Sequence, residues 1–400
     1  MAATIHKFER RETKDAKAGA AGRGPVSGAR FEALDILRGL FIIGMLIANN
    51  AGDWAHIYPQ FDHAEWHGFT LTDMVFPGFM VCVGISMTLS LGRRMGDGGK
   101  GDMAFHIVRR ALILVAIGVF LNALPGFDLA HLRLPGVLQR IGLCYAIAAM
   151  LVLLHSHKGA DGTLIVHPRA LAFWAVGLLV GYAVVLKFIP VPGFGANRFD
   201  SEGSWPAYVD RIVPGIQHIW QQGLTNGRIT YDPEGILSTP PATFNILAGL
   251  LIGLYIKSKT PREAVAGVAI TGIVLMVLAL ALDGQIPIIK KLWTPSFALL
   301  TSGFAMTLLS VLMLIMDRLG FKTWAMPIRV LGTNAILAYV FAWLLSIALE
   351  VTGLGALATN FLHARIQDPY LMSFVFALMV LGIVWLVVLP FYLKKIFLKI

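Results

Sequence analysis

Hydrophobic residues recur in long runs, separated by short polar stretches, from residue 34 to the C-terminus. A run of about 20 apolar residues can cross the hydrocarbon core of a membrane as a helix. A helix also satisfies its own backbone hydrogen bonds in lipid. The pattern predicts ten membrane-spanning helices, of which the sixth is the least well marked. Their approximate bounds are 34–52, 69–91, 105–124, 136–155, 171–189, 243–256, 264–282, 297–316, 328–351 and 370–393.

Composition supports the same fold class. The 400 residues are 56% hydrophobic and only 14% charged, and the mean hydropathy is +0.71. A soluble protein of this composition would have too little polar surface to cover itself, so we expect an all-α polytopic membrane protein in contact with lipid. The net charge of +10 does not indicate nucleic-acid binding, because Lys and Arg lie in short loops between apolar runs.

The basic residues predict the orientation of the bundle. With Arg38, the N-terminal stretch and the loops near 92–110, 156–170, 257–263, 317–329 and 394–400 hold 24 of the 33 Lys and Arg residues. Loops rich in Lys and Arg stay on the cytoplasmic side. Both termini are therefore predicted to be cytoplasmic. The nine basic residues predicted on the other side are Arg133, Arg140, Lys187, Arg198, Arg211, Arg228, Lys290, Lys291 and Arg365.

Two segments differ from the alternation of spans and short loops. Residues 1–30 are polar and lack the apolar core of a signal peptide, so we expect a disordered cytoplasmic tail. Residues 31–400 then form one transmembrane domain. Its extracytoplasmic loop, 190–242, is too long for a plain connector and contains the sequence YDPEGIL. Long loops of this kind are often functional lids.

The loop between the first two spans concentrates titratable groups. In YPQFDHAEWHGFTLTDMVFPGFM, His63 has Asp62 and Glu65 close by, His67 follows, and Asp73 falls inside the second span. His63 is either a solvated surface residue or a general base or nucleophile near neutral pH. His67 competes for that role. Asp73 could orient a histidine or bind an amine, and it needs a partner if it is buried.

Polar residues within the first span allow two interpretations each. Asp35 and Arg38 are three residues apart, so they share a helix face and could form a sealing ion pair or a functional one. Asn49 and Asn50 come near the other end of the span. They could link helices through hydrogen bonds, or one of them could donate to a developing oxyanion.

Arginines also mark the start of the fourth span. In HLRLPGVLQR, Arg133 and Arg140 are seven residues apart, with Gln139 beside the second. About two helical turns would place both arginines on one face, unless Pro135 breaks the helix. Such guanidinium groups suit phosphate or carboxylate, or they lie at the membrane interface with their stems in lipid. The sequence KKLW, Lys290–Trp293, is a second basic cluster and ends in an aromatic residue.

Several common signatures are missing from the sequence. There is no phosphate-binding loop of the type G-x-x-x-x-G-K-[ST], no dinucleotide fingerprint, no G-x-S-x-G elbow and no obvious internal repeat. Cys82 and Cys144 lie inside apolar runs and predict neither a disulfide framework nor a metal site. We expect no metal.

Six blocks of sequence resemble the heparan-alpha-glucosaminide N-acetyltransferase family, including its bacterial NagX-type members. They are LDILRGLFIIGMLIAN, HAEWHGFTLTDMVFPGF, RLPGVLQRIG, YDPEGILST, KKLWTPSF and GTNAILAYV, in the family's order across roughly 33–340. One departure is FAWLL after the last block, where the family carries a His-Glu pair. No role of that pair is carried over.

The resemblance implies acetyl transfer across a bacterial inner membrane, from cytoplasmic acetyl-CoA to the amine of a glucosamine-type sugar on the periplasmic side. It assigns the active-site histidine to His63 and an assisting asparagine to Asn49, and it is compatible with a homodimer. We add Asp73 as the group that orients the imidazole. The candidates for substrate or cofactor contacts are Arg38, Trp66, Arg133, Gln139, Arg140, Asp232, Glu234, Lys290, Trp293 and Asn334.

Two other functions fit the sequence. Intramembrane Asp, Arg and Asn residues are also typical of proton-coupled transporters, and an amino-sugar transporter would need no acetyl donor. An acyltransferase that uses another acyl-CoA or another envelope glycan is the third possibility. Cleavage of a thioester by the purified protein separates the enzymes from the transporter.

Overall fold

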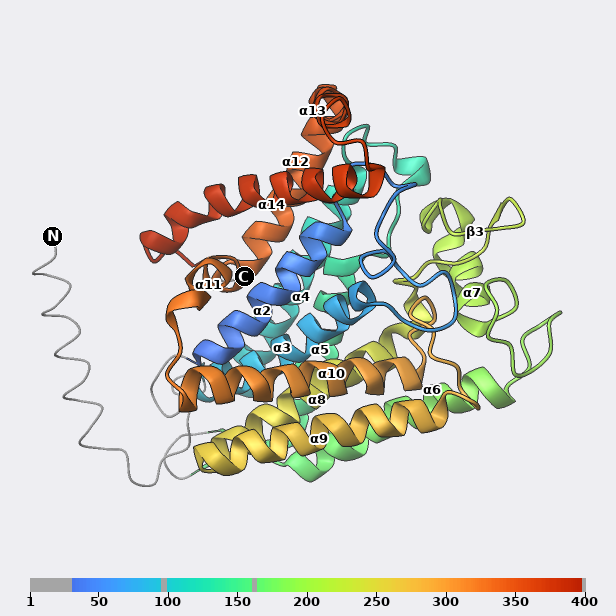
Figure 1. The fold of residues 1–400 in the computed structure, drawn as a ribbon. Helices are drawn as coiled ribbons and strands as arrows, with labels where there is room; N and C mark the ends of the chain where they lie inside the picture. Colours follow the sequence, from blue (N-terminus) through green and yellow to red (C-terminus); the bar gives the residue numbers. More distant parts are fainter. Residues whose placement is uncertain (1–30, 95–98, 160–163, 398–400) are drawn as a thin grey trace, which may run out of the picture.

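A computed structural model describes residues 31–94, 99–159 and 164–397, and it is almost entirely helical (Figure 1). All ten predicted segments lie on helices. The helices are α2 (Glu32–Ala48), α3 (Leu71–Arg94), α4 (Lys100–Ala123), α5 (Val137–Leu154), α6 (Pro168–Phe188), α7 (Trp205–Asp210), α8 (Thr239–Ser258), α9 (Pro261–Leu282), α10 (Pro295–Met313), α11 (Met326–Thr333), α12 (Ala335–Val351), α13 (Leu354–His363) and α14 (Pro369–Leu393).

Proline marks the beginning of five of the long helices, α6, α8, α9, α10 and α14. Proline is well tolerated there because the first backbone N–H groups of a helix have no partner within the helix. Polar caps reinforce two of these starts. Thr260 and Glu263 form a capping box at α9, and the Asp368 side chain accepts a hydrogen bond from Tyr370 N at α14.

The predicted fold class is confirmed. Within the described residues, eight helices are long and apolar enough to cross a membrane, and nine are when α11 and α12 count as one bent span. The remaining predicted segment is α2, whose 17 residues reach about 25 Å at the usual rise per residue. The protein is an all-α polytopic membrane protein.

Two predicted segments differ from the structure, and one helix was not predicted. The first span ends at Ala48 rather than at residue 52, because Asn50 turns back and donates a hydrogen bond to Leu46 O at 2.7 Å. The ninth segment is two helices, which meet at Asn334 with a bend of 71°. Asn334 leaves the helical conformation with φ −124° and ψ 45°. The third difference is α13, whose 10 residues are too short to show as a long apolar run in the sequence.

The helices differ in how much of each is covered by the rest of the protein. In α3, α8 and α10, 83%, 72% and 67% of the span is buried, whereas only 17% of α9 and 28% each of α4, α6 and α14 is buried. The first three therefore form the centre of the bundle, and the other four present most of their surface to lipid. In Figure 1, α9 and α6 lie below α10, and α14 lies on the far side of α2 from them.

Two glycines allow the central helices α3 and α8 to touch. A Cβ on Gly84 of α3 would lie 2.0 Å from Ile246 O, and a Cβ on Gly249 of α8 would lie 2.1 Å from Val81 O. Small residues at such crossings permit close backbone packing, which drives helix association in membranes. Replacing either glycine would force the two helices apart.

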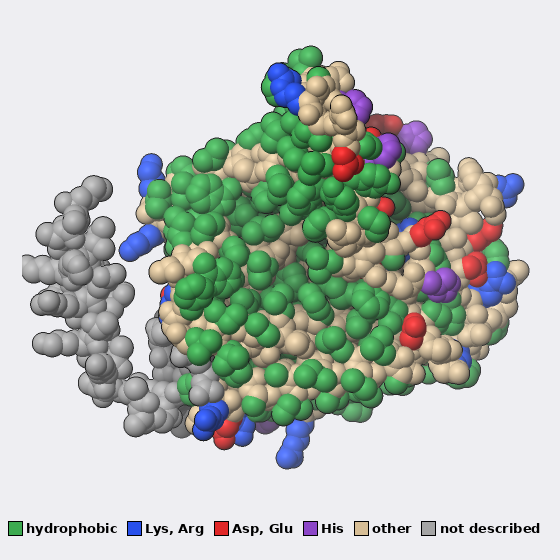
Figure 2. All heavy atoms as spheres, viewed as in Figure 1, with side chains coloured by type: hydrophobic (Ala, Val, Ile, Leu, Met, Phe, Trp, Pro, Cys, Tyr) green, Lys and Arg blue, Asp and Glu red, His purple; other side chains and the backbone are tan. Residues whose placement is uncertain are grey.

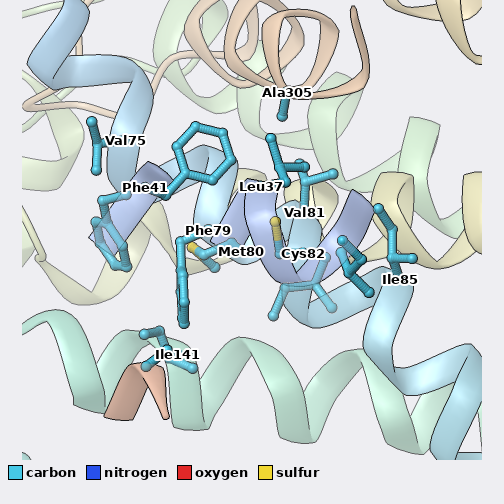
Figure 3. Packing of buried hydrophobic residues seen from close by; sticks show 14 of the residues in the cluster. Leu37, Phe41, Val75, Phe79, Met80, Val81, Cys82, Ile85, Ile141 and Ala305 are labelled. Atoms are coloured by element: carbon cyan, nitrogen blue, oxygen red, sulfur yellow. The ribbon is translucent and has the colours of Figure 1, made fainter. Parts of the chain in front are cut away.

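The apolar core fills the space between these helices. Figure 3 shows Leu37 and Phe41 of α2 packing with Phe79 and Met80 of α3, and all four side chains are buried. Gly78 lets the Phe41 ring approach, since a Cβ there would meet the ring at 2.4 Å. This packing fixes α2 against α3, and the polar loop that joins them lies at one end of the bundle.

Polar side chains gather at the two ends of the helices, while hydrophobic side chains cover the middle of the face shown in Figure 2. We call the end that carries residues 49–70 the His63 end. The loop 190–242 joins it and contains α7 and a small hairpin, β3 (Leu224–Thr225) and β4 (Arg228–Ile229). The opposite end carries the hairpin of β1 (Ser156–Lys158) and β2 (Leu164–Val166). The predicted tail, 1–30, lies outside the described residues.

Candidate active site

The loop between α2 and α3 is held in place by hydrogen bonds at both of its sides. Thr70 Oγ1 donates to Asp62 O at 2.6 Å, and Thr72 Oγ1 donates to Phe61 O at 2.8 Å. Gly68 N donates to Ile288 O at 2.8 Å, which joins the loop to the segment before α10. These bonds place His63 next to the first turn of α3.

His63 and Asp73 form a hydrogen-bonded pair, with 2.7 Å between His63 Nδ1 and Asp73 Oδ1. The Asp73 side chain is fully buried, whereas that of His63 is 40% exposed. Asp73 Oδ2 accepts from Ala64 N at 3.1 Å and from Thr70 N at 3.0 Å. An ionised carboxylate only accepts hydrogen bonds, so Nδ1 carries the proton and Nε2 is unprotonated.

Lys290 completes a group of three. Its Nζ lies 2.8 Å from His63 Nδ1, 3.0 Å from His63 Nε2 and 3.5 Å from Asp73 Oδ1. Burial lowers the pKa of His63, the Lys290 ammonium lowers it further, and Asp73 opposes both. Burial also lowers the pKa of Lys290, against the attraction of Asp73 and Glu234. The sequence placed His63, Asp73 and Lys290 among the candidates, and the structure brings the three together.

A second cluster fastens the long loop to the start of α5. Arg133 binds Asp232 at two points, Nε–Oδ2 at 2.8 Å and Nη2–Oδ1 at 2.6 Å, and it binds Glu234 Oε2 at 2.6 Å. Arg140 Nη2 donates to Gly235 O at 2.7 Å and to Ser238 Oγ at 2.6 Å. We call this group the arginine latch.

The structure decides between the two outcomes that the spacing of Arg133 and Arg140 left open. Arg133 is not on a helix with Arg140, because Pro135 and Gly136 keep the chain extended and α5 begins only at Val137. The latch carboxylates pull the pKa of Arg133 upwards against the effect of burial. Burial alone would raise the pKa of Glu234, but Arg133 and the other nearby cations lower it. Both latch arginines thus bind groups of the protein itself.

Aromatic side chains connect the latch to the His63 loop. Trp66 Nε1 donates to Phe199 O at 2.8 Å, and the Trp66 ring meets the edge of Tyr231 at a centroid distance of 5.0 Å. Lys291 Nζ lies 5.7 Å from the Trp66 ring and 5.6 Å from the Tyr231 ring. Cations within about 6 Å of a ring face are attracted to it. Trp66 was a candidate from the sequence, whereas Tyr231 and Lys291 were not.

Trp293 is fully buried below this end of the bundle. Its Nε1 donates to Asn245 Oδ1 at 2.9 Å, and the Arg140 guanidinium lies 4.8 Å from its ring centroid. Gln139, the neighbour of Arg140, donates to Leu134 O at 3.2 Å. Other groups of the protein therefore bind the side chains of Trp293, Arg140 and Gln139. These three side chains pack beneath the site and support it.

Two of the remaining candidates lie at the opposite end of the bundle from His63. Asn49 is the exposed residue that ends α2, whereas Asn50 is buried and accepts from Ser346 Oγ at 2.5 Å. Arg38 is paired with Asp35 at the opposite end of α2. Asn334 also lies near that end, since it donates to Ile396 O at 3.2 Å. The structure does not bring Arg38 or Asn334 to the His63 end.

Asp210 is a titratable residue next to the latch that the sequence did not single out. Its side chain is fully buried, and its Oδ1 accepts from Ile236 N at 3.0 Å. Burial raises the pKa of Asp210 to about 7, with a further contribution from Asp232. Its only sequence signal was a position within the long loop. Among the described residues, no three His, Cys, Asp or Glu side chains are arranged to hold a metal ion.

Comparisons with known proteins show which family the chain is related to. A family model described as heparan-alpha-glucosaminide N-acetyltransferase, catalytic, matches residues 30–200. The heparan-alpha-glucosaminide N-acetyltransferase of Homo sapiens is 31% identical over 351 residues, which cover 78% of this chain and 52% of the human protein. That of Mus musculus is 30% identical over 356 residues, covering 78% and 53%. The chain spans about half the length of these relatives. It belongs to the heparan-alpha-glucosaminide N-acetyltransferase family.

Proposed function

We propose that the protein is a transmembrane acetyltransferase that transfers acetyl from acetyl-CoA to the amine of a glucosamine-type sugar. The observation that carries the proposal is the 2.7 Å hydrogen bond between His63 and the buried Asp73, at an end of the bundle where the imidazole stays 40% exposed. A histidine oriented by a buried carboxylate is the arrangement that general-base and nucleophilic catalysis require.

The proposed reaction joins the amine nitrogen to the acetyl carbonyl carbon and breaks the bond between that carbon and the CoA sulfur. His63 Nε2 takes the proton that the amine loses, and the proton then passes to the departing thiolate. Asp73 stabilises the imidazolium that forms in between, because its carboxylate accepts the Nδ1–H bond. A second route has His63 Nε2 accept the acetyl group and pass it to the amine.

The tetrahedral intermediate carries an oxyanion in both routes, and Asn49 is the proposed donor to it. Asn49 is exposed at the His63 end of α2, whereas the neighbouring Asn50 is held by Ser346. Asn49 is therefore the amide of the two that a substrate can reach. One such donor typically contributes about 3–4 kcal/mol to stabilisation of the transition state.

The donor is proposed to enter from the cytoplasm, which places the His63 end on the periplasmic side of a bacterial inner membrane. This orientation follows the distribution of Lys and Arg. Arg38, Arg109 and Arg110 are the candidates for the CoA phosphates at the opposite end. The pantetheine arm would then extend along the bundle toward His63. We also propose that the protein forms a homodimer, as the family resemblance implies.

The decisive experiment uses the purified full-length protein in lipid nanodiscs. It is given acetyl-CoA with glucosamine or a chito-oligosaccharide, and free thiol and acetylated sugar are measured. Equal amounts of both products, lost in His63→Ala, are expected. Sugar uptake into proteoliposomes without thioester cleavage would instead establish the transporter. Faster turnover of a longer acyl-CoA would redefine the donor.

A further inference from the structure

The Lys290 ammonium is a largely buried charge beside His63, not a solvated surface group. The side chain is 13% exposed, and its Nζ lies within 3.0 Å of both ring nitrogens and 3.5 Å from Asp73 Oδ1. A buried ammonium repels any second positive charge at this distance. Protonation of His63 would place an imidazolium against that ammonium.

The segment that carries Lys290 is tightly fixed. Ile289 N donates to Thr294 Oγ1 at 3.1 Å, and Trp293 N donates to Lys290 O at 2.8 Å. Tyr182 OH of α6 donates to Leu292 O at 2.6 Å. Trp293 adopts the left-handed conformation, with φ 51°, in which the chain turns into α10. These contacts hold the Lys290 backbone in place, and Asp73 attracts the ammonium to its position beside His63.

The charges around His63 come from four parts of the chain. Its own loop contributes carboxylates, α3 contributes Asp73, and the segment before α10 contributes two ammonium groups. The long loop contributes one carboxylate, which favours protonation of His63 as Asp73 does. The facing groups are Asp62, Glu65, Asp73, Glu234, Lys290 and Lys291. Lys290 is the cation closest to the ring, because Lys291 Nζ turns away to Glu65 O at 2.6 Å.

We propose that Lys290 is a positioning residue whose ammonium keeps His63 neutral and leaves its Nε2 unprotonated in the resting protein. Asp73 alone would stabilise the imidazolium and remove the base near neutral pH. Lys290 offsets that pull, while Asp73 still fixes the tautomer. The same charge disfavours the ammonium form of an acceptor amine bound at Nε2, so both reacting groups are present as free bases. The effect on the amine rests on the proposed function, whereas the effect on His63 does not.

The test measures protonation of His63 without using catalysis. The full-length protein in nanodiscs is treated with diethyl pyrocarbonate, which reacts with neutral imidazole, from pH 5 to pH 9. Modification of the His63 peptide is followed by mass spectrometry, with the exposed His67 as internal reference. Lys290→Met removes the charge, Lys290→Arg keeps it, and Lys291→Met is the matched control.

The wild-type His63 midpoint is expected below 6.5, the ordinary imidazole value. In Lys290→Met it should rise by about one to three pH units, the usual effect of a charge at this range, while Lys290→Arg and Lys291→Met should stay near the wild type. The acid limb of kcat/KM for acetyl transfer should move with the midpoint in the active variants. A wild-type midpoint at or above 6.5 overturns the proposal even if Lys290→Met does not fold. Equal shifts in the Met and Arg variants also overturn it. A protein that shows the expected midpoints but cleaves no thioester contradicts the proposed function and leaves the role of Lys290 intact.

Discussion

Arg133 and Asp232 are separated by 99 residues of chain and meet in a two-point ion pair, with distances of 2.8 and 2.6 Å. The pair joins the start of α5 to the long loop, and Glu234 binds the same guanidinium at 2.6 Å. The side chain of Asp232 is fully buried and that of Glu234 is 10% exposed. The positive charge of Arg133 thus compensates the negative charges of two carboxylates that little water can reach.

Arg133→Leu should destabilise the loop strongly, because it leaves two buried carboxylates without this partner. Removing one member of a buried ion pair typically costs about 3–5 kcal/mol. The expected result is a lower thermal midpoint and rapid proteolysis within 190–242. The control is Arg198→Leu, since the Arg198–Asp200 pair is 42% exposed on both sides, and it should change neither measurement. Equal resistance of Arg133→Leu and the wild type would contradict the structural role of the latch.

Acetyl-CoA binding by a folded preparation of Arg133→Leu tests the direction of the donor. If the CoA phosphates bind at the opposite end, the dissociation constant should stay nearly unchanged, while the KM for the sugar should rise. Isothermal titration in nanodiscs measures the first quantity directly. A tenfold loss of donor affinity, about 1.4 kcal/mol, would place the phosphates near the latch and reverse the proposed direction.

His63→Ala should lower the rate of acetyl transfer by at least about a hundredfold, the smallest loss usual for a missing general base. Asp73→Asn should also be severe, because an amide can present an N–H to His63 and so favour the wrong tautomer. His67→Ala is the matched control, since His67 is exposed in the same loop and should cost little. Comparable losses in the His63 and His67 variants would refute the assignment.

The predicted orientation can be tested with single cysteines at positions where the structure leaves room. A Cβ on Gly101, Gly126 or Gly284 would meet no atom within 4 Å. Both resident cysteines, Cys82 and Cys144, are fully buried and should stay silent. In intact cells an impermeant thiol reagent should label Gly126→Cys and Gly284→Cys but spare Gly101→Cys. The reverse pattern would invert the bundle.

Asp210 should make the stability of the long loop depend on pH. Its pKa is raised to about 7, mainly by burial, from an ordinary value of 3.8. As the pH rises between these values, the unfolded chain loses a proton that the folded chain keeps, so the free energy of unfolding falls by about 1.4 kcal/mol per unit. The thermal midpoint of Asp210→Asn should therefore exceed that of the wild type at pH 8 and lose its advantage near pH 4. Parallel curves for the two proteins would exclude Asp210 as the cause.

Much of the fold was predictable from the sequence because lipid imposes a simple pattern. Each long apolar run except the ninth, which is divided between α11 and α12, became one helix, and proline marked several of the starts. The break at Asn334 was not predicted, because the short, less apolar α11, which contains Arg329, runs directly into the strongly apolar α12 and was joined to it as one span. The end of α2 depended on one side chain, that of Asn50, which bonds back to Leu46 O.

The candidate site was partly predictable. His63 and Asp73 are only ten residues apart in the sequence, so their pairing follows from local sequence. Lys290 is 227 residues from His63 in the sequence, and their contact depends on how α3 and α10 pack. The burial of Asp210 was not predictable either, because it is created by the loop that folds over this residue. A single sequence identifies the type of group at these positions but not its neighbours.

The contacts of the Trp293 side chain restrict how the surrounding helices can move. Its side chain contacts Phe76 of α3, Arg140 of α5, Asn245 of α8 and Phe297 of α10, while its backbone N–H is bonded to Lys290 O. A rocking motion that opens the bundle alternately to each side would have to pull these helices away from one fully buried indole. The helices around Trp293 should instead behave as a rigid body. An extended donor could cross such a bundle while the reaction centre stays still.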